Sequence, residues 1–596
     1  MSNEQQRRAS LVYHAKPEPG KTKVVPSKNY DTQRDLALAY SPGVAIPCKE
    51  INNEKSDVYK YTNKGNLVAV ISNGTAVLGL GDIGPLSSKP VMEGKALLFK
   101  IFAGIDVFDI EVDAKDPEKF IQTVKAIAPT FGGINLEDIK SPEAFEIERR
   151  LKEEIDIPVM HDDQHGTAII SAAALINAIE LANKKIKDVK IVVSGAGAAA
   201  ISCSKLYLSL GANIKNLIML DSKGVIKKNR KNLTPEKEQF ATNLDIKNLE
   251  EAIVNADVFI GLSQPNILSP SMLKRMASNP IVFAMANPDP EIGYDIACKT
   301  RKDIIMATGR SDHPNQVNNV LGFPFIFRGA LDVRATAINE EMKMAAVKAL
   351  ADLAKEPVPE QVNVAYEETR LTFGKNYIIP KPFDPRLITT IPPAVAKAAM
   401  DSGVATEPIE DWERYINNLE KRLGNSQKMV RLLHDRAKLS PKRLVFAEAD
   451  QMDVLKAAQI VHEEGIAIPI LLGNISRIKE LRRIIEFDDD IEVIDPKEEK
   501  EKELRKKYAE LFWNSQKRKG YTLYDSQRLM RERNHFGSMM IKNGDADAMI
   551  SGYSRNYRNV VKPILEIIPK NKGVSRVAAT NLMLTKSGPL FLSDTT

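Results

Sequence analysis

Short apolar runs alternate with helical patterns along most of the chain, and this alternation predicts an α/β fold. The clearest example starts at residues 190–194, where a short apolar run fits one buried strand. A helical pattern follows over 201–210, and a second strand over 217–220 ends at Asp221. The same reasoning predicts further strands at 257–263, 443–448 and 469–473, helices at 411–423 and 453–464, and a continued α/β pattern through 544–552.

The segment between the first strand and its helix fits the dinucleotide-binding pattern G-x-G-x-x-A. Its glycines allow a tight turn and a close approach of the backbone to pyrophosphate at a helix N-terminus, and its last small residue lets helix and strand pack. Asp221 lies 24 positions past Gly197, where an acid can accept a hydrogen bond from the 2′-hydroxyl of NAD. Lys223 could instead hold the 2′-phosphate of NADP, so both cofactors remain open at this point. The predicted cofactor residues are Gly195, Ala196, Gly197, Ala198, Ala200, Asp221 and Lys223.

Residues 79–84 also fit a bare G-x-G-x-x-G pattern. The Pro-Leu-Ser-Ser run at 85–88 is expected to delay any helix after it. We therefore predict a loop beside the substrate rather than a second nucleotide turn.

Two pairs of adjacent acids lie at the ends of predicted elements. Asp162 and Asp163 follow a buried-looking strand, and Glu137 and Asp138 lie about twenty-five residues upstream. Carboxylates in this number and placement suit a hard divalent cation bound by oxygen. The alternative is that Asp162 caps a helix starting near Gly166 while the other pair sits on a solvated turn.

Composition narrows the class of protein. At 596 residues, the chain is long enough for three or so compact units, and its net charge of +6 is small for this length. The basic stretches 500–507 and 517–519 alternate with Glu and aromatic residues, which favours an exposed helix over a nucleic-acid groove. No apolar run approaches a membrane span, the first residues lack an apolar signal core, and three cysteines show no pairing or metal-ligand spacing, so a cytoplasmic protein is expected.

Five segments together resemble malic enzymes of the shorter, bacterial form, in the family's order. The resemblance covers roughly residues 10 to 425, and any one of the segments alone would be weak. In this family the metal ligands match Glu137, Asp138 and Asp163, for Mg²⁺ or Mn²⁺. The five segments are 39–45, 91–96, 135–139, 161–168 and 286–290.

The same resemblance assigns the reacting groups. Lys95 matches the general base, Tyr40 the general acid and Asp162 an acid that supports the base, while Asn287 and Asn319 match substrate-binding residues. There is one departure from the larger eukaryotic enzymes, which carry a substrate-binding Arg near position 76, where this chain has only small side chains. The substrate carboxylate is therefore expected to be held by other groups.

These residue types suit the oxidation of a 2-hydroxy acid. A lysine can accept the hydroxyl proton when its surroundings lower its pKa towards neutrality. A divalent cation can polarise the resulting ketone, which then loses CO2, and a phenol can protonate the enolate at C3. Taken alone, Tyr40 is more often a packed turn residue and Lys95 a solvated helix residue.

The resemblance implies a domain organisation for the chain. Residues 1–160 are expected to form the substrate and metal domain, 161–424 a Rossmann-type NAD(P)-binding domain, and 425–440 a linker after the break at 424–426. The Pro-rich run 378–408 is expected to be an irregular but packed end of the first part.

Residues 441–596 resemble the phosphate acetyl/butyryltransferase family through less specific motifs in the right order. The chain ends in a strand-like run at 589–596, so this region is expected to be a partial α/β domain, with a complete small domain as the alternative.

The expected reaction is oxidative decarboxylation of (S)-malate to pyruvate and CO2 with NADP, with NAD possible and oxaloacetate decarboxylation as a further activity. The alternatives are a malolactic-type decarboxylase, or an acyltransferase whose first unit is not catalytic. The resemblance also implies a homo-oligomer, a dimer or higher, in which the segment around Tyr40 could complete a neighbour's site. It further implies acetyl-CoA as a possible regulator of a longer form.

Overall fold

The chain forms two compact units in the computed structural model, and each is described by itself. The first comprises Met1–Val362 and Arg370–Leu423, and the second Gly424–Thr596 together with Asn363–Thr369. Among the residues described, no helix is both long enough and apolar enough to cross a bilayer. The structure describes residues 3–77, 80–286, 289–359, 362–363, 366, 371–422, 433–434, 436–485, 487, 491–574, 577–585 and 588–593.

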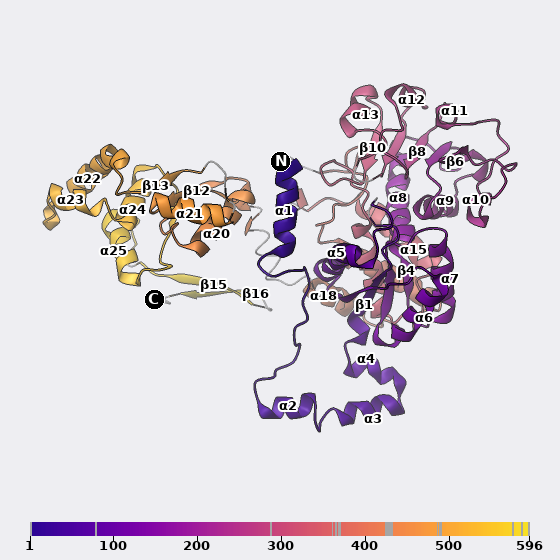
Figure 1. Ribbon diagram of the computed structural model, residues 1–596, viewed down its shortest axis with the longest axis horizontal. Helices are drawn as coiled ribbons and strands as arrows, with labels where there is room; N and C mark the ends of the chain where they lie inside the picture. The colour runs from indigo at the N-terminus through magenta and orange to yellow at the C-terminus, as the bar shows by residue number, and fades with distance from the viewer. Residues whose placement is uncertain are drawn as a thin grey trace. The chain divides into compact units, whose positions relative to one another are not determined.

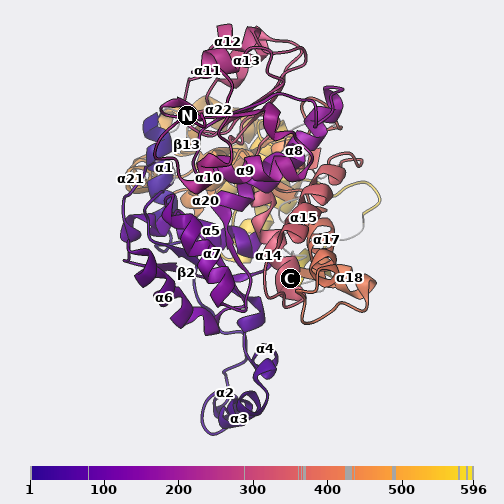
Figure 2. The same ribbon diagram turned by 90° about the vertical axis from the view of Figure 1, so that its right-hand side faces the viewer.

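The first unit opens with short helices outside its sheets. Helices α2 and α3 bury none of their residues, and they lie apart from the strands in both side views (Figures 1 and 2). The bounds of the four helices are α1 Asn3–Ala15, α2 Gln33–Ala39, α3 Ala45–Asn53 and α4 Val58–Tyr61.

A four-stranded parallel sheet in the order β2-β1-β3-β4 follows. Every residue of β1 is buried, as expected for an apolar strand covered on both faces. Leu136 at the end of β3 pairs with His161 at the end of β4, so the acids that follow these strands emerge side by side. The elements are β1 Leu67–Ser72, α5 Pro85–Ala103, β2 Asp106–Glu111, α6 Pro117–Ile127, β3 Gly133–Leu136, α7 Glu143–Glu154 and β4 Val159–His161.

Helix α5 corrects one expectation. It begins at Pro85, directly after Gly84, so the proline does not delay a helix. A proline suits the first helical position because its missing N–H would have no partner there. Residues 80–84 before it are not helical, and residues 78 and 79 lie outside the described residues.

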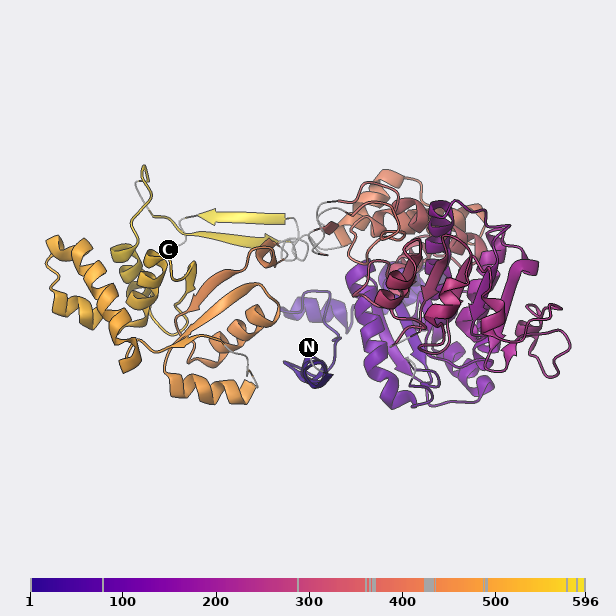
Figure 3. The ribbon, with the colours of Figure 1, turned by 90° about the horizontal axis from the view of Figure 1, so that it is seen from above.

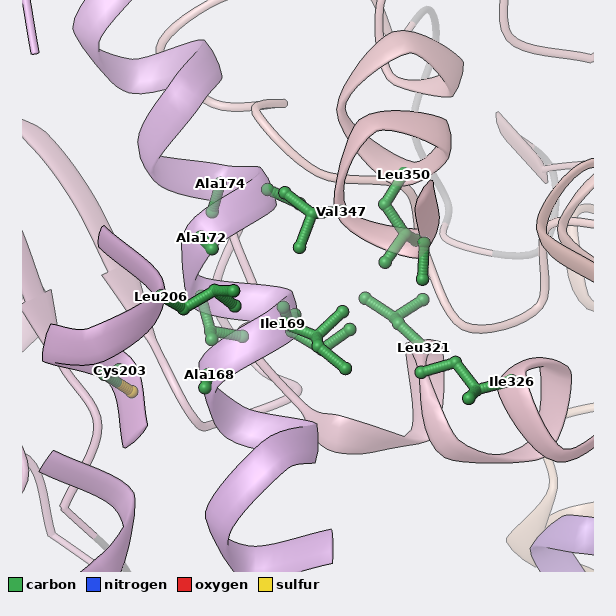
Figure 4. Packing of buried hydrophobic residues seen from close by; sticks show 14 of the residues in the cluster. Ala168, Ile169, Ala172, Ala174, Cys203, Leu206, Leu321, Ile326, Val347 and Leu350 are labelled. Atoms are coloured by element: carbon green, nitrogen blue, oxygen red, sulfur yellow. The ribbon is translucent and has the colours of Figure 1, made fainter. Parts of the chain in front are cut away.

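Helix α8, Asp162–Leu181, holds the acid-bearing turn in the core. It begins at Asp162 and not near Gly166, so the alternative in which Asp162 caps a later helix is wrong. Its buried side chains pack between α9 (Ala198–Ser209) and α15 (Glu340–Leu353), as Ala168, Leu206 and Val347 show in Figure 4. This packing fixes the direction in which the first turn points.

The second sheet has the order β10-β9-β8-β5-β6-β7, parallel except for β7. Strand β5, the connecting α9 and strand β6 form the predicted βαβ unit, with α9 starting at Ala198 rather than at 201. The change of direction in strand order falls at β5, where doubly wound sheets bind ligands. The strands are β5 Ile191–Ser194, β6 Leu217–Asp221, β7 Gly224–Val225, β8 Val258–Gly261, β9 Ile281–Ala284 and β10 Ile305–Thr308. Short helices between them are α10 Pro235–Glu238, α11 Leu249–Ala252, α12 Pro270–Lys274 and α13 Tyr294–Thr300.

A group of helices closes the first unit and gathers on one side of it (Figure 2). The Pro-rich run was expected to be irregular, but α17 is a helix that contains Pro392 and Pro393. An interior proline removes a helical hydrogen bond, and the burial of apolar residues along α17 offsets that loss. The elements here are η5 Asn319–Leu321, α14 Phe323–Asp332, α15, α17 Leu387–Asp401 and α18 Trp412–Arg422.

The second unit contains a parallel sheet in the order β13-β12-β11-β14 and a separate antiparallel hairpin of β15 and β16, drawn in yellow in Figure 3. The basic stretch at 500–507 enters α22, which buries Arg505, Tyr508 and Phe512, so this helix is amphipathic rather than exposed all round. Its strands are β11 Lys442–Phe446, β12 Ala467–Leu472, β13 Val493–Ile494, β14 Ala548–Ile550, β15 Thr580–Thr585 and β16 Gly588–Ser593. Its helices are α20 Met452–Glu463, α21 Ile475–Ile485, α22 Lys502–Gln516, α23 Leu523–Leu529, α24 Arg533–Asn543 and α25 Tyr557–Ile567.

Candidate active site

Three carboxylates converge where β3 and β4 end. One oxygen each from Glu137, Asp138 and Asp163 lies within 4.8 Å of the others. Glu137 and Asp138 are 4% and 3% exposed, so a solvated turn does not describe them. Asp138 also adopts a left-handed backbone conformation, with φ of 53°, and its N–H donates to Asp163 Oδ2 at 2.7 Å. Strained backbone of this kind is found more often at functional sites than elsewhere.

Lys95 is buried on α5 and faces this cluster. Its Nζ lies 2.6 Å from Asp162 Oδ2 and 2.8 Å from Glu137 Oε1, and it rests 4.3 Å from the centre of the Phe323 ring. Lys95 is therefore not a solvated helix residue. Burial alone would lower its pKa, but the charges of Asp162 and Glu137 outweigh burial and raise it. A lowered pKa, the condition for a lysine to act as the base, is therefore not produced by these neighbouring side chains alone.

Asp162 contacts both Lys95 and Asn319. Its Oδ2 accepts from Lys95 and from the Asn319 amide, while its Oδ1, although buried, has no hydrogen-bond partner among the residues described. Burial raises the pKa of Asp162 to about 6. A Cβ at Gly166 would lie 2.0 Å from Asp162 Oδ1, so only glycine leaves room for this carboxylate over the first turn of α8.

Of the two predicted substrate-binding residues, the structure places only Asn319. It is the first residue of η5, and its amide donates to Asp162. Asn287 lies outside the described residues. The role of each as a substrate ligand stays a prediction.

The structure does not bring Tyr40 to Lys95 within one chain. Tyr40 follows the last residue of α2, is 77% exposed and lies on the part of the first unit that projects away from the sheets (Figure 1). Its role as a general acid stays a prediction.

The predicted nucleotide turn lies between β5 and α9. Gly195 has a φ of +120°, and a Cβ there would lie 2.4 Å from the Leu262 carbonyl oxygen, so this position requires glycine. Gly197 faces open space, Ala198 starts α9, and Ala196 and Ala200 are buried. A cavity of about 730 Å³ opens over this turn, and among its lining residues are Gly195, Ala196, Gly197, Asp221 and Lys237.

Asp221 is neutralised by cations that the sequence did not single out. Arg230 donates to both of its oxygens, at 3.0 and 2.8 Å, and Lys237 Nζ lies 3.6 Å away. Lys223 is exposed, and it is the backbone N–H of Lys223 that donates to Asp221, at 2.9 Å. Burial opposes the charge of Asp221, but this N–H and Arg230 together lower its pKa. The only signal in the sequence was a basic loop after the acid, which does not say which cation folds back.

Glu291 is a further buried acid that sequence reasoning missed. It is completely buried, and its two oxygens accept from the backbone N–H groups of Ser263 and Ala286, at 3.0 and 3.1 Å. It therefore ties the loop after β8 to the loop after β9, beside the cofactor cavity. In the sequence it follows the run Asn-Pro-Asp-Pro, and an acid after two prolines is ordinarily expected to lie on the surface.

Family models match most of the chain. Residues 19–152 match the N-terminal domain of malic enzyme, 164–367 its NAD-binding domain, and 428–596 phosphate acetyl/butaryl transferase.

Individual relatives match over the same span. An NADP-dependent malic enzyme of Salmonella typhimurium is 52% identical over all of this chain and 79% of the relative. An NAD-dependent malic enzyme of Rhizobium meliloti is 48% identical over 98% of this chain and 76% of the relative. The crystal structure of malic enzyme from Pyrococcus horikoshii superposes with a TM-score of 0.65 at 41% identity, over 72% of this chain and 99% of that one. The chain belongs to the malic enzyme family, with a phosphate acetyl/butyryltransferase-like region after the malic enzyme domains.

Proposed function

We propose that the first unit catalyses the oxidative decarboxylation of (S)-malate to pyruvate and CO2 with reduction of NADP. The observation that carries the proposal is the burial of Lys95 between Asp162 and a cluster of three carboxylates. A base, an oxygen-rich cation site and a nucleotide cavity in one unit are the parts that this reaction needs. The name of the Salmonella relative supports the same reaction.

The acid cluster suits Mg²⁺ or Mn²⁺. Glu137, Asp138 and Asp163 provide hard oxygen ligands whose atoms converge. The buried Oδ1 of Asp162, which has no hydrogen-bond partner among the residues described, is a further oxygen acceptor beside them. A bound divalent cation would supply Lewis-acid polarisation of the substrate oxygen. It would also offset the negative charges that now raise the pKa of Lys95.

Lys95 is proposed to take the hydroxyl proton of malate. The contact of its Nζ with Asp162 fixes the direction of the amine, and Asn319 fixes Asp162 in turn. The buried wall that Phe323 forms beside the amine keeps water away from it. A nicotinamide in the cavity over Gly195–Gly197 would accept the hydride from C2 of malate.

Tyr40 is proposed to protonate C3 of the enolate in a second copy of the chain. Its own copy leaves it exposed, directly after α2, a helix that lies apart from α5 in Figure 1. The segment that carries it displays an apolar surface that no described part of its own chain covers: Leu36, Leu38, Tyr40, Val44 and Ile46 are all exposed. Apolar surface of this extent fits an interface, and a two-fold dimer would exchange the segment reciprocally.

NADP is preferred over NAD in this proposal because Arg230 and Lys237 already surround Asp221. An uncompensated carboxylate favours a ribose hydroxyl, whereas cations beside it favour a 2′-phosphate.

The test of the reaction is direct. Protein, malate and Mn²⁺ are mixed with NADP or NAD, and absorbance of the reduced cofactor and release of pyruvate are both followed. Pyruvate formed together with reduced NADP supports the proposal. Lactate formed without net reduction of the cofactor would identify a malolactic-type enzyme, and no reaction at all would refute both.

A further inference from the structure

A chain of polar side chains, with a buried residue at each end and the half-buried His165 between them, connects three helices beside the acid cluster. Glu148 belongs to α7, His165 to the first turns of α8, and Lys343 to α15. Glu148 and Lys343 are 5% and 2% exposed, although both are charged types that proteins rarely bury without a partner. Nothing in the proposed reaction uses these three residues directly.

Glu148 holds the first turn of α8 at two points. Its Oε1 accepts from the backbone N–H of His161 at 3.0 Å and lies 2.9 Å from His165 Nε2. Asp162 and Asp163 lie between these two histidines in the chain. The Glu148 carboxylate therefore contacts the backbone just before Asp162 and Asp163 and the side chain of His165 just after them.

The remaining contacts fix Glu148 itself. Lys343 Nζ lies 3.1 Å from His165 Nδ1, and Lys152 Nζ lies 2.7 Å from Glu148 Oε1. A lysine ammonium can only donate, so His165 Nδ1 accepts and its Nε2 carries the proton that is donated to Glu148. Burial alone would raise the pKa of Glu148, but the opposing effect of His165 and Lys152 is larger and holds it well below its usual range. Glu148 is thus a carboxylate.

Both acids on this turn need a fixed orientation. Asp163 is a proposed metal ligand whose Oδ2 also accepts from Asp138 N–H, and Asp162 directs Lys95. A small rotation of the turn would move both carboxylates at once. Loss of a partner that orients a metal ligand typically weakens metal affinity about 10- to 100-fold.

We propose that Glu148 is a positioning residue that, through His161 and His165, sets the geometry of the acid cluster and so its affinity for a divalent cation. Lys343 assists by fixing the ring of His165. This inference rests on the metal site of the proposed function.

The test measures Mn²⁺ binding without malate or cofactor, by the electron paramagnetic resonance signal of free Mn²⁺. Glu148→Gln keeps the shape of the side chain but places an amide against groups that only donate. It is expected to raise the Kd for Mn²⁺ about 10- to 100-fold, the usual effect of losing such a partner. Glu154→Gln is the matched control, because Glu154 ends the same helix and pairs with Lys125 and Arg150 at the surface. Its Kd is expected to equal that of the wild type.

Thermal unfolding identifies variants that have lost the fold. A folded Glu148→Gln variant with wild-type Mn²⁺ affinity would overturn the proposal. If that variant does not fold, Lys343→Met decides, because it leaves the contact between Glu148 and His161 in place; a several-fold weaker affinity supports the proposal and an unchanged one refutes it. Failure of the wild type to bind Mn²⁺ would instead refute the metal site itself, and this inference with it.

Discussion

Mixing two inactive variants tests whether Tyr40 works in a neighbouring chain. Tyr40→Phe and Lys95→Ala each remove one reacting group. Tyr40 is 77% exposed, so its substitution is expected to change the free energy of unfolding by less than about 0.5 kcal/mol. Each loss of a positioned acid or base lowers the rate roughly 10²- to 10⁴-fold, so each variant alone retains about 1% of the activity or less.

The geometry fixes the size of the recovery. If the Tyr40 segment is exchanged in a dimer, a mixed dimer has one site with both defects and one intact site. With equal amounts of the two chains, about half of the dimers are mixed, and the population regains about a quarter of the wild-type rate. This recovery is far above the residual rate of either variant.

The assay is pyruvate formation by co-expressed chains carrying different affinity tags, compared with each variant alone. Wild-type chains mixed with the double variant give the reverse control: about a quarter of the rate remains if Tyr40 acts in the neighbour, and about half if it acts in its own chain. A mixture of the single variants no more active than its components would refute the exchanged site.

Three other predictions follow from named contacts. Glu137→Gln is expected to raise the Mn²⁺ concentration needed for turnover, whereas Asp162→Asn lowers the maximal rate more than the metal affinity; titrations of activity with Mn²⁺ that show the same change in both would contradict the distinct roles. Arg230→Ala is expected to weaken NADP binding at least 10-fold while NAD changes little, and Lys223→Ala to have the smaller effect; equal losses for both cofactors, measured by fluorescence titration, would count against a 2′-phosphate site. Burial alone would raise the pKa of Glu448, but hydrogen bonds from Ser554 and backbone N–H groups outweigh burial and lower it. Glu448 is therefore expected to stabilise the second unit fully above about pH 4.5 and progressively less as the pH falls below it. Glu448→Gln is expected to remove this pH dependence from the melting temperature, and an unchanged dependence would contradict the stabilising role of the carboxylate.

Patterns confined to a few consecutive residues predicted much of the molecule. The strands around Gly195 and Asp221 are apolar runs of the right length, and the turn between them has glycine where the backbone requires it. The two acid pairs could be identified because each lies at the end of a predicted element rather than on a solvated helix face. These features depend on residues that are close together in the sequence, so the sequence alone is enough to predict them.

Contacts between distant segments could not be predicted in the same way. Lys343 meets His165 across 178 positions, and Arg230 folds back onto Asp221 from a basic loop that offered several equivalent cations. The direction of the pKa shift of Lys95 could not be predicted either, because it depends on how closely two carboxylates approach the amine. The prediction of an irregular segment at α17 was wrong because it was based on the number of prolines. That number contains no information on the apolar burial that offsets a lost helical hydrogen bond.

Helix α8 explains how so many buried charges can be held in one place. Its later turns are almost entirely apolar and packed on several sides, as Ala168, Ile169 and Ala172 illustrate in Figure 4, so they cannot move without losing core contacts. Its first turn carries Asp162 and Asp163, whose mutual repulsion is reduced by Lys95 on α5. Glu148 on α7, itself paired with Lys152, accepts from the backbone N–H just before these acids. Because a buried charge without a partner is costly, each of these contacts constrains the others, and the positions of the acids depend on all of them. Glu148 contacts the chain on both sides of Asp162 and Asp163, which is why its loss is expected to act on the affinity of the cluster for a cation.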